Sequence, residues 1–172
     1  MNHFEASLKL VLGHEAGYVN NPNDRGGETN LGISDRRDGL IDGMADINGD
    51  RVPDVRIKDL TPEQAAQVYW RDYWKPLRCD ELHPSVAYVL FDTAVNAGNS
   101  QAVKLLQRGL QLADDGLIGP KTIAAANRDP KHTVLSLAVQ RVMFNAGLSS
   151  WSHFGKGWTK RIFEVFQKSI TM

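Results

Sequence analysis

The sequence predicts a mainly α-helical fold with a small, loop-rich lobe that has room for a short β-hairpin. Apolar residues recur every three or four positions over most of the chain, a spacing that places them on one face of a helix. This periodicity is lost between residues 18 and 60, where glycine, asparagine and aspartate dominate. The hairpin strands are expected there, around Leu31–Ile33 and Val52–Ile57. A long loop region in a compact chain is usually functional, so we expect the lobe to carry part of a site.

The first two helices are indicated by apolar spacing and by a capping motif. A helix that ends near residues 13–17 follows from apolar residues at positions i, i+4, i+7 and i+8: Phe4, Leu8, Val11 and Leu12. A second helix is expected over 62–75. Its capping box has Thr61 as the N-cap and Gln64 as the reciprocal partner, with Pro62 at the first helical position.

Five further helices are expected in the second half of the chain. Pro84 and Pro120 stand where two of them begin, because proline is favoured at the first helical position, and Gly98 ends one of them. No internal repeat or low-complexity linker divides the chain, so a single domain over residues 1–172 is expected. The helices are expected at about 84–98, 101–113, 120–127, 133–145 and 158–170.

The composition narrows the class of protein. A chain of 172 residues with 42% hydrophobic and 23% charged residues is long enough to close one sizeable core. The 20 basic and 20 acidic side chains cancel, so the overall charge gives no support for binding to nucleic acid. Residues 131–172 hold 6 basic side chains against 1 acidic one. This basic tail is typical of a solvated helix face, and contact with an anionic polymer or membrane surface is the alternative.

The sequence also bears on the compartment. Cys79 is the only cysteine, which excludes an internal disulfide. The N-terminus lacks the basic start and the apolar run of a signal peptide, and no stretch reaches the roughly 20 apolar residues of a membrane span. We therefore expect synthesis in the cytoplasm and no stable insertion into a membrane.

The stretch HEAGYVNNPNDRGGETN, residues 14–30, is more polar than folding requires. Hydrolysis of a glycosidic bond needs a protonated carboxylic acid and a second carboxylate, both facing a cleft. Glu15 follows an apolar helix face, where partial burial would raise the pKa of its carboxyl group, as an acid requires. Asp24 lies in a hydrated loop and would stay ionised, and Thr29 from the same loop would orient water.

A simpler interpretation of these residues stays open. A glutamate at the end of a helix is often only solvated, and an aspartate before Arg25 and Gly26 is typical of a turn. Glu28 is an alternative to Asp24 as the second carboxylate.

The segment resembles known enzymes. Its Glu, Asp and Thr are similar to the catalytic arrangement of many phage lysozymes, which usually have five residues between the Asp and the Thr where this chain has four. The longer stretch HEAGYVNNPNDRGGETNLGIS, residues 14–34, resembles the signature of glycoside hydrolase family 108, the predicted N-acetylmuramidases of phage endolysins and bacterial secretion activators. The family usually has glycine in place of Ala16, and its proposed catalytic glutamate corresponds to Glu15.

A second resemblance covers the rest of the chain. Residues 91–127 and the segment FGKGWTKR, residues 154–161, resemble the predicted peptidoglycan-binding region that accompanies this hydrolase. The two resemblances together imply a lysozyme-like domain, with the hydrolase motif in residues 1–90 and a helical, peptidoglycan-binding portion in residues 91–172.

The resemblance implies the reaction and the partners. The expected substrate is bacterial peptidoglycan, cleaved at the β-1,4 bond between N-acetylmuramic acid and N-acetylglucosamine. The expected protein is a monomer that requires no cofactor and reaches the cell wall after release, in the phage case with help from a holin. Two alternatives are a lytic transglycosylase, which breaks the same bond without an attacking water, and a non-catalytic peptidoglycan-binding or secretion-accessory protein.

Three further residues are candidates for contact with the glycan. Tyr18 and Asn30 flank the motif, although Tyr18 could equally be a core aromatic residue with a solvated hydroxyl. Asn96 lies on the expected helix 84–98, where its carboxamide would either reach sugar acetamido groups or cap the helix ahead of Gly98.

One loop has a calcium-type pattern. Asp46, Asn48, Asp50 and Asp54 occupy positions 1, 3, 5 and 9 of such a loop. Position 12 is Ile57 instead of a bidentate carboxylate, and a turn rich in Asp and Asn would give the same pattern. Calcium is therefore a candidate structural ion. A zinc protease motif is excluded, because Tyr18 stands where His-Glu-x-x-His needs its second histidine.

Overall fold

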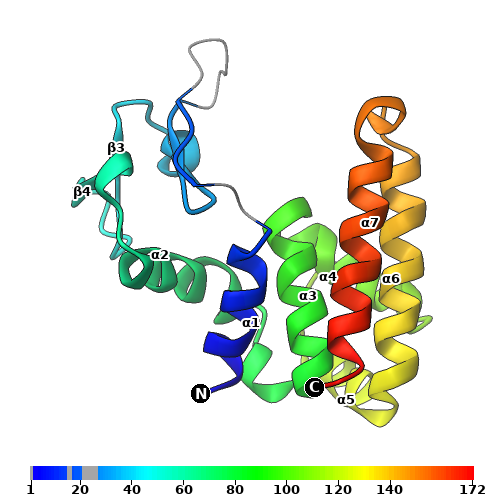
Figure 1. The fold of residues 1–172 in the computed structure, drawn as a ribbon. Helices are drawn as coiled ribbons and strands as arrows, with labels where there is room; N and C mark the ends of the chain where they lie inside the picture. Colours follow the sequence, from blue (N-terminus) through cyan, green and yellow to red (C-terminus); the bar gives the residue numbers. More distant parts are fainter. Residues whose placement is uncertain (1, 15–16, 21–26) are drawn as a thin grey trace. The chain divides into compact units, whose positions relative to one another are not determined.

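The computed structural model describes residues 2–14, 17–20 and 27–172 of the chain (Figure 1). Its described residues form seven α-helices and two sheets of two strands each, which confirms the mainly α fold class. None of these helices is long and apolar enough to cross a membrane. The chain divides into two compact units, Met1–Asp72 and Tyr73–Met172, which are described in turn. The helices are α1 (His3–Leu12), α2 (Pro62–Tyr69), α3 (Pro84–Ala97), α4 (Asn99–Gly109), α5 (Pro120–Arg128), α6 (Pro130–Ala146) and α7 (Trp151–Ser169).

Both helices of the first unit begin at a capping box. In α1, the Asn2 side chain accepts from the N–H of Glu5 at 2.8 Å, and the Glu5 carboxylate accepts from the N–H of Asn2 at 3.3 Å. The predicted box of α2 is confirmed, with bonds of 3.3 and 3.0 Å between Thr61 and Gln64. Helix α2 ends at Tyr69, earlier than expected, because a π-helix, η3 (Trp70–Trp74), follows it.

The lobe holds two short antiparallel hairpins instead of one. Strand β1 (Thr29–Asn30) pairs with β2 (Ile33–Ser34), and β3 (Met44–Ala45) pairs with β4 (Val55–Arg56). The two expected strand segments therefore do not pair with each other. The reason lies in the turn between β1 and β2, where Leu31 and Gly32 have φ values of 49° and 74°. Two successive left-handed residues close a tight two-residue hairpin, so β2 pairs with its neighbour in sequence.

Short helical turns and side-chain bonds connect these hairpins. Two 3₁₀ turns, η1 (Asp35–Asp38) and η2 (Ile57–Asp59), follow β2 and β4. The amide of Asn30 donates to the carbonyls of Ile57 and Lys58 at 3.0 and 3.2 Å, and Tyr69 donates its hydroxyl to the carbonyl of Leu31 at 3.1 Å. These bonds satisfy polar groups that would otherwise be buried without partners, and they fix the first hairpin to the rest of the lobe.

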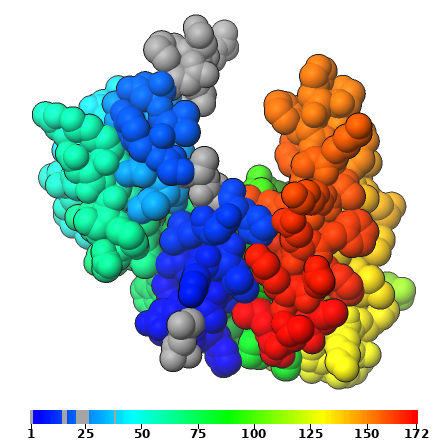
Figure 2. All heavy atoms as spheres, in the orientation of Figure 1, coloured from blue at the N-terminus to red at the C-terminus, as the bar shows by residue number. Residues whose placement is uncertain are grey.

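The second unit is a helical bundle built around α3. Residues 85–94 of this helix are all buried, and α4, α6 and α7 pack against it. Helix α7, drawn in orange to red, lies along α6, drawn in yellow, over most of its length (Figure 2). A 3₁₀ turn, η4 (Cys79–Glu81), precedes the bundle.

Helix α7 begins seven residues before its expected start at Trp158. Gly155 and Gly157 weaken the helix signal in the sequence, because glycine is a poor helix former. In the fold, Gly155 is buried, and a Cβ at this position would lie 2.6 Å from the ring of Trp151. Packing of an aromatic ring against the glycine therefore compensates for its low helix propensity.

One buried carboxylate joins three helices of the bundle. Asp92 of α3 is fully buried and accepts from Arg141 of α6 at 2.6 Å and from Arg161 of α7 at 2.8 and 3.1 Å. Burial alone would raise the pKa of Asp92, but the two guanidinium groups outweigh it and hold the pKa below its usual range. The aspartate therefore stays ionised and neutralises charges that would be costly to bury alone.

Replacing this carboxylate should destabilise the bundle strongly. In the variant Asp92→Asn, Arg141 and Arg161 lose the buried carboxylate that neutralises them, so we expect the free energy of unfolding to fall by about 3–5 kcal/mol. The exposed pair of Asp114 and Arg108 provides the control, because Asp114→Asn should cost less than about 1 kcal/mol. Urea denaturation followed by circular dichroism measures both values. Equal stabilities of the two variants would contradict the role given to Asp92.

Candidate functional site

The two predicted catalytic carboxylates, Glu15 and Asp24, lie outside the described residues. The third predicted catalytic residue, Thr29, lies in β1 with its side chain half-buried. Its backbone pairs with that of Val19 through bonds of 2.8 and 2.9 Å, in an isolated antiparallel bridge. Asp24 therefore lies in sequence between two residues that the lobe holds together.

The predicted glycan contacts are divided between the two units. Tyr18, in the first unit, is 46% exposed, in agreement with a surface role and not with a core role. Asn30 is 8% exposed and its amide group is already bonded inside the lobe. Asn96, in the second unit, is exposed and donates its amide to the carbonyl of Asp92 at 2.7 Å, one turn earlier in the helix. Contact of these residues with glycan stays a prediction.

The alternative second carboxylate, Glu28, is half-buried beside Thr29. Its carboxylate accepts from the amide of Asn20 at 3.2 Å. The glycine before it, Gly27, has a φ of 73°, and a Cβ there would lie 2.6 Å from the Asp35 carboxylate. The absence of a side chain at Gly27 thus lets the backbone lie close to Asp35 within the lobe.

The four predicted calcium ligands form an ordered turn. Each side chain accepts a backbone N–H of the same loop at 2.6–3.0 Å: Asp46 from Gly49 and Arg51, Asn48 from Asp50, Asp50 from Val52, and Asp54 from Ile47. Over the ranges that the structure describes, no three His, Cys, Asp or Glu side chains are grouped so that they could hold a metal ion. The bonds account for the Asp and Asn pattern as turn chemistry, and calcium stays a prediction.

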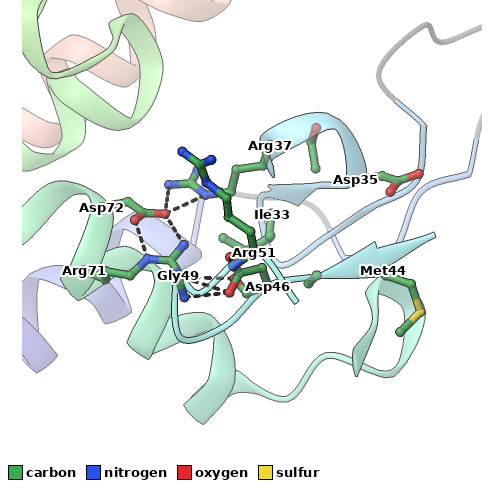
Figure 3. A pocket seen from close by; sticks show the side chains of 11 residues that line it. Ile33, Asp35, Arg37, Met44, Asp46, Gly49, Arg51, Arg71 and Asp72 are labelled. Atoms are coloured by element: carbon green, nitrogen blue, oxygen red, sulfur yellow. Dashed lines mark hydrogen bonds and ion pairs between the residues drawn. The ribbon is translucent and has the colours of Figure 1, made fainter. Parts of the chain in front are cut away.

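The lobe contains a pocket of about 590 Å³ that sequence inspection did not reveal (Figure 3). It lies among β2, η1, β3, the 46–51 loop and η3. Three arginines and two aspartates gather at one end of the pocket, and Asp35 and Met44 lie at the other end in this view. The five charged residues are Arg37, Arg51, Arg71, Asp46 and Asp72.

Asp72 is held between two guanidinium groups. Arg37 donates to it from Nε and Nη2 at 2.9 and 2.6 Å, and Arg71 donates from Nε and Nη2 at 2.5 and 2.7 Å. Partial burial raises the pKa of Asp72, but the hydrogen bonds and charges of both arginines lower it further, so the pKa lies below its usual range. Because Arg71 and Asp72 are consecutive in the π-helix, η3 fixes one wall of the pocket.

Asp46 anchors the opposite wall. Burial raises the pKa of Asp46, but the N–H groups of Gly49 and Arg51 and the charge of Arg71 together lower it below its usual value. Arg71 also donates to the backbone carbonyl of Asp46 at 3.2 Å. Gly49 has a φ of 87°, and a Cβ there would lie 3.1 Å from Cδ of Arg71, so the glycine leaves room for the arginine to cross the loop.

At the other end of the pocket, Asp35 holds the chain as it enters β3. It is 3% exposed, and one of its oxygens accepts the N–H groups of Asp42 and Gly43 at 3.2 and 3.0 Å. Backbone N–H groups thus bind the carboxylate of Asp35. The charged residues of the pocket come from three separate segments of the chain, so no local pattern indicates the pocket.

Two comparisons with known proteins bear on the function. A model of the family described as glycosyl hydrolase 108 matches residues 8–98. Among solved structures, SagA of Brucella abortus is 32% identical, with a TM-score of 0.81, and the match covers 98% of this chain and 94% of that chain. None of the curated proteins compared with the chain matches it.

The calcium hypothesis makes a thermal prediction. An ion bound by the 46–57 loop only in the folded state stabilises that state, and calcium at tenfold excess over its Kd should raise the Tm by about 3–5 °C. Differential scanning fluorimetry with EDTA, and then with added calcium, measures this shift. The variant Asp50→Asn should lose the shift, because it removes one of the predicted ligands. A Tm that EDTA leaves unchanged would rule out a stabilising calcium ion in this loop.

Proposed function

The chain belongs to glycosyl hydrolase family 108, and from this premise we propose that it hydrolyses the β-1,4 bond between N-acetylmuramic acid and N-acetylglucosamine in bacterial peptidoglycan. The observation that carries this proposal is the family match over residues 8–98, which contains the whole polar segment 14–34. The full-length similarity to SagA supports the same family. A role of residues 91–172 in binding peptidoglycan belongs to the proposal as well.

The proposed mechanism assigns one step to each of three residues. Glu15 donates a proton to the leaving oxygen, because bond cleavage builds negative charge there. Asp24 acts from the opposite face of the sugar, either as the base that activates water or as a stabiliser of the oxocarbenium-like transition state. Thr29 orients the water. Carboxyl groups about 6.5–9.5 Å apart would invert the anomeric centre, and groups about 5–5.5 Å apart would retain it.

The described part of the lobe supports this assignment. Thr29 is fixed on both sides, by its backbone bonds to Val19 and by its pairing with Ser34 across the β1–β2 hairpin. A residue that places a water molecule must itself be held in position, since small displacements lower the rate. A hairpin position bonded to two neighbouring segments provides this rigidity.

Removing the proposed acid should abolish activity. For Glu15→Gln we expect kcat on purified peptidoglycan to fall by about 10²–10⁴-fold, because glutamine cannot donate a proton to the leaving oxygen. Glu63→Gln, an exposed change in the first turn of α2, is the matched control and should keep full activity. Turbidity loss gives the rate and mass spectrometry identifies the products. Reducing sugar ends support hydrolysis, anhydro-muramic ends would assign a lytic transglycosylase, and an active Glu15→Gln variant would refute acid catalysis by Glu15.

The activities of two variants identify the second catalytic carboxylate. If Asp24 activates water or stabilises the transition state, Asp24→Asn should lower kcat by about 10²-fold or more while Glu28→Gln stays within a few-fold of the wild type. The reverse order would assign the role to Glu28. Full activity of both variants would contradict a mechanism with two carboxylates. Circular dichroism of each variant verifies that the fold is kept.

A further inference from the structure

We propose that the pocket of about 590 Å³ in the lobe binds a carboxylate, and that Arg51 is the residue that recognises it (Figure 3). The ligand that fits is the carboxylate end of a peptide stem of peptidoglycan, an identification that rests on the proposed function. The carboxylate site itself follows from the charges, the geometry and the lining of the pocket.

Among the residues that line the arginine end of the pocket, basic side chains outnumber acidic ones. Three arginines stand against Asp46 and Asp72 there, and both aspartates already have partners for their oxygens. Arg37 and Arg71 both pair with the carboxylate of Asp72, and Arg71 also forms an ion pair with Asp46 at 3.6 Å. An additional carboxylate could therefore meet Arg51, the third cation at this end of the pocket, without displacing a bond that Asp46 or Asp72 already makes.

Arg51 is the cation left for a ligand. Within the described residues its guanidinium group makes neither a hydrogen bond nor an ion pair, and the residue is exposed. In Figure 3 its side chain extends toward the end of the pocket where Arg37 and Asp72 lie. A guanidinium group presents several N–H donors in a plane, which match the two oxygens of a carboxylate.

The backbone at Arg51 has an unusual conformation that a hydrogen bond to Asp46 stabilises. Arg51 has a φ of 70°, an uncommon value for a residue with a side chain, and the Asp46 carboxylate fixes its N–H at 3.0 Å. The facing wall is the π-helix η3, which supplies Arg71 and Asp72. Left-handed non-glycine residues and π-helical turns are concentrated at functional sites in proteins. Two such features on the two walls of one pocket are difficult to explain by folding alone.

The size and the lining of the pocket favour a peptide over a simple anion. A volume of about 590 Å³ falls within the range of small-molecule sites, about 300–1,000 Å³, and is far larger than an ion needs. Ile33, Met44 and Ala45 add apolar surface to the lining. Alanine methyl groups next to a terminal carboxylate, as at the end of a peptidoglycan stem, would use both kinds of surface.

The pocket is also close to the proposed catalytic segment. Thr29 pairs directly with Ser34 across the hairpin, and Ser34 lines the pocket. Residues directly opposite in an antiparallel pair have Cα atoms about 4.5–5.5 Å apart. A glycan that reaches Thr29 would therefore have its peptide stem within reach of the pocket.

Binding of a small peptide to the 172-residue chain tests the site without any need for catalysis. The probes are N-acetyl-D-alanyl-D-alanine, its C-terminal amide and inorganic phosphate, titrated by NMR chemical shift or calorimetry. We expect the wild type to bind the acid and not the amide, and Arg51→Gln to weaken the acid about fivefold or more, since it loses a charge-assisted hydrogen bond. Arg36→Gln, an exposed change of the same charge in η1, is the control and should match the wild type.

The outcomes separate the site from its alternatives. Equal binding of acid and amide, no binding of the acid by the wild type, or unchanged binding by a folded Arg51→Gln variant would overturn the proposal. Phosphate that binds more tightly than the acid and depends on Arg51 would overturn the peptide assignment in favour of a phosphate ligand. Thermal unfolding of Arg51→Gln verifies the fold, and we expect no change because the side chain is exposed.

Hydrolysis rates then test the link to peptidoglycan. With glycan strands that carry peptide stems, Arg51→Gln should lower kcat/KM about fivefold or more, and with strands freed of peptides it should match the wild type. Equal losses on both substrates would overturn the role of the stem. If the wild type cleaves neither substrate, the proposed function fails, whereas the difference between acid and amide binding still decides whether the pocket binds carboxylates.

Discussion

A carboxylate held between two arginines is the interaction on which the lobe depends. Asp72 brings Arg37, from the turn after β2, and Arg71, from the π-helix, to one point. Without this carboxylate the two guanidinium groups would repel each other, and Arg37 would lose its ion pair with η3. The bundle uses the same chemistry at Asp92, but that residue is fully buried, whereas Asp72 is partly exposed. Partial exposure is what makes the Asp72 cluster available to a ligand.

The lobe obtains its order from polar bonds more than from regular structure. Its strands contain two residues each, so few ladder hydrogen bonds are available to hold them. Side chains supply the rest: Asn30 bonds to the η2 turn, Asp35 holds the entry to β3, and Asp46 closes its own loop. Such bonds are directional, and they fix the positions of neighbouring groups more closely than apolar contacts do. This arrangement suits a site that must orient a polar polymer.

The hairpin β1–β2 connects two roles within the lobe. On one strand, Thr29 belongs to the polar segment for which we propose the bond cleavage. On the other strand, Ile33 and Ser34 line the arginine pocket. The tight turn at Leu31 and Gly32 sets the register between the strands. One backbone element thus determines how far the proposed water-positioning residue lies from the proposed carboxylate site.

The sequence by itself determined the helical class, most of the helix positions and the family. Apolar spacing and capping residues act locally, so the box at Thr61 and the start of α3 at Pro84 could be read from neighbouring residues. The polar segment 14–34 identified the family in the same local way.

Only the tertiary structure decided what depends on contacts between distant residues. The early start of α7 required the ring of Trp151 against Gly155, and the pocket required Arg37 and Arg51 to meet a π-helix some twenty or more residues later in the chain. An arginine has the same one-letter code in the sequence whether its guanidinium group is solvated or lines a site. Its distance to a carboxylate, and the burial of both groups, are set by the fold and not by the local pattern.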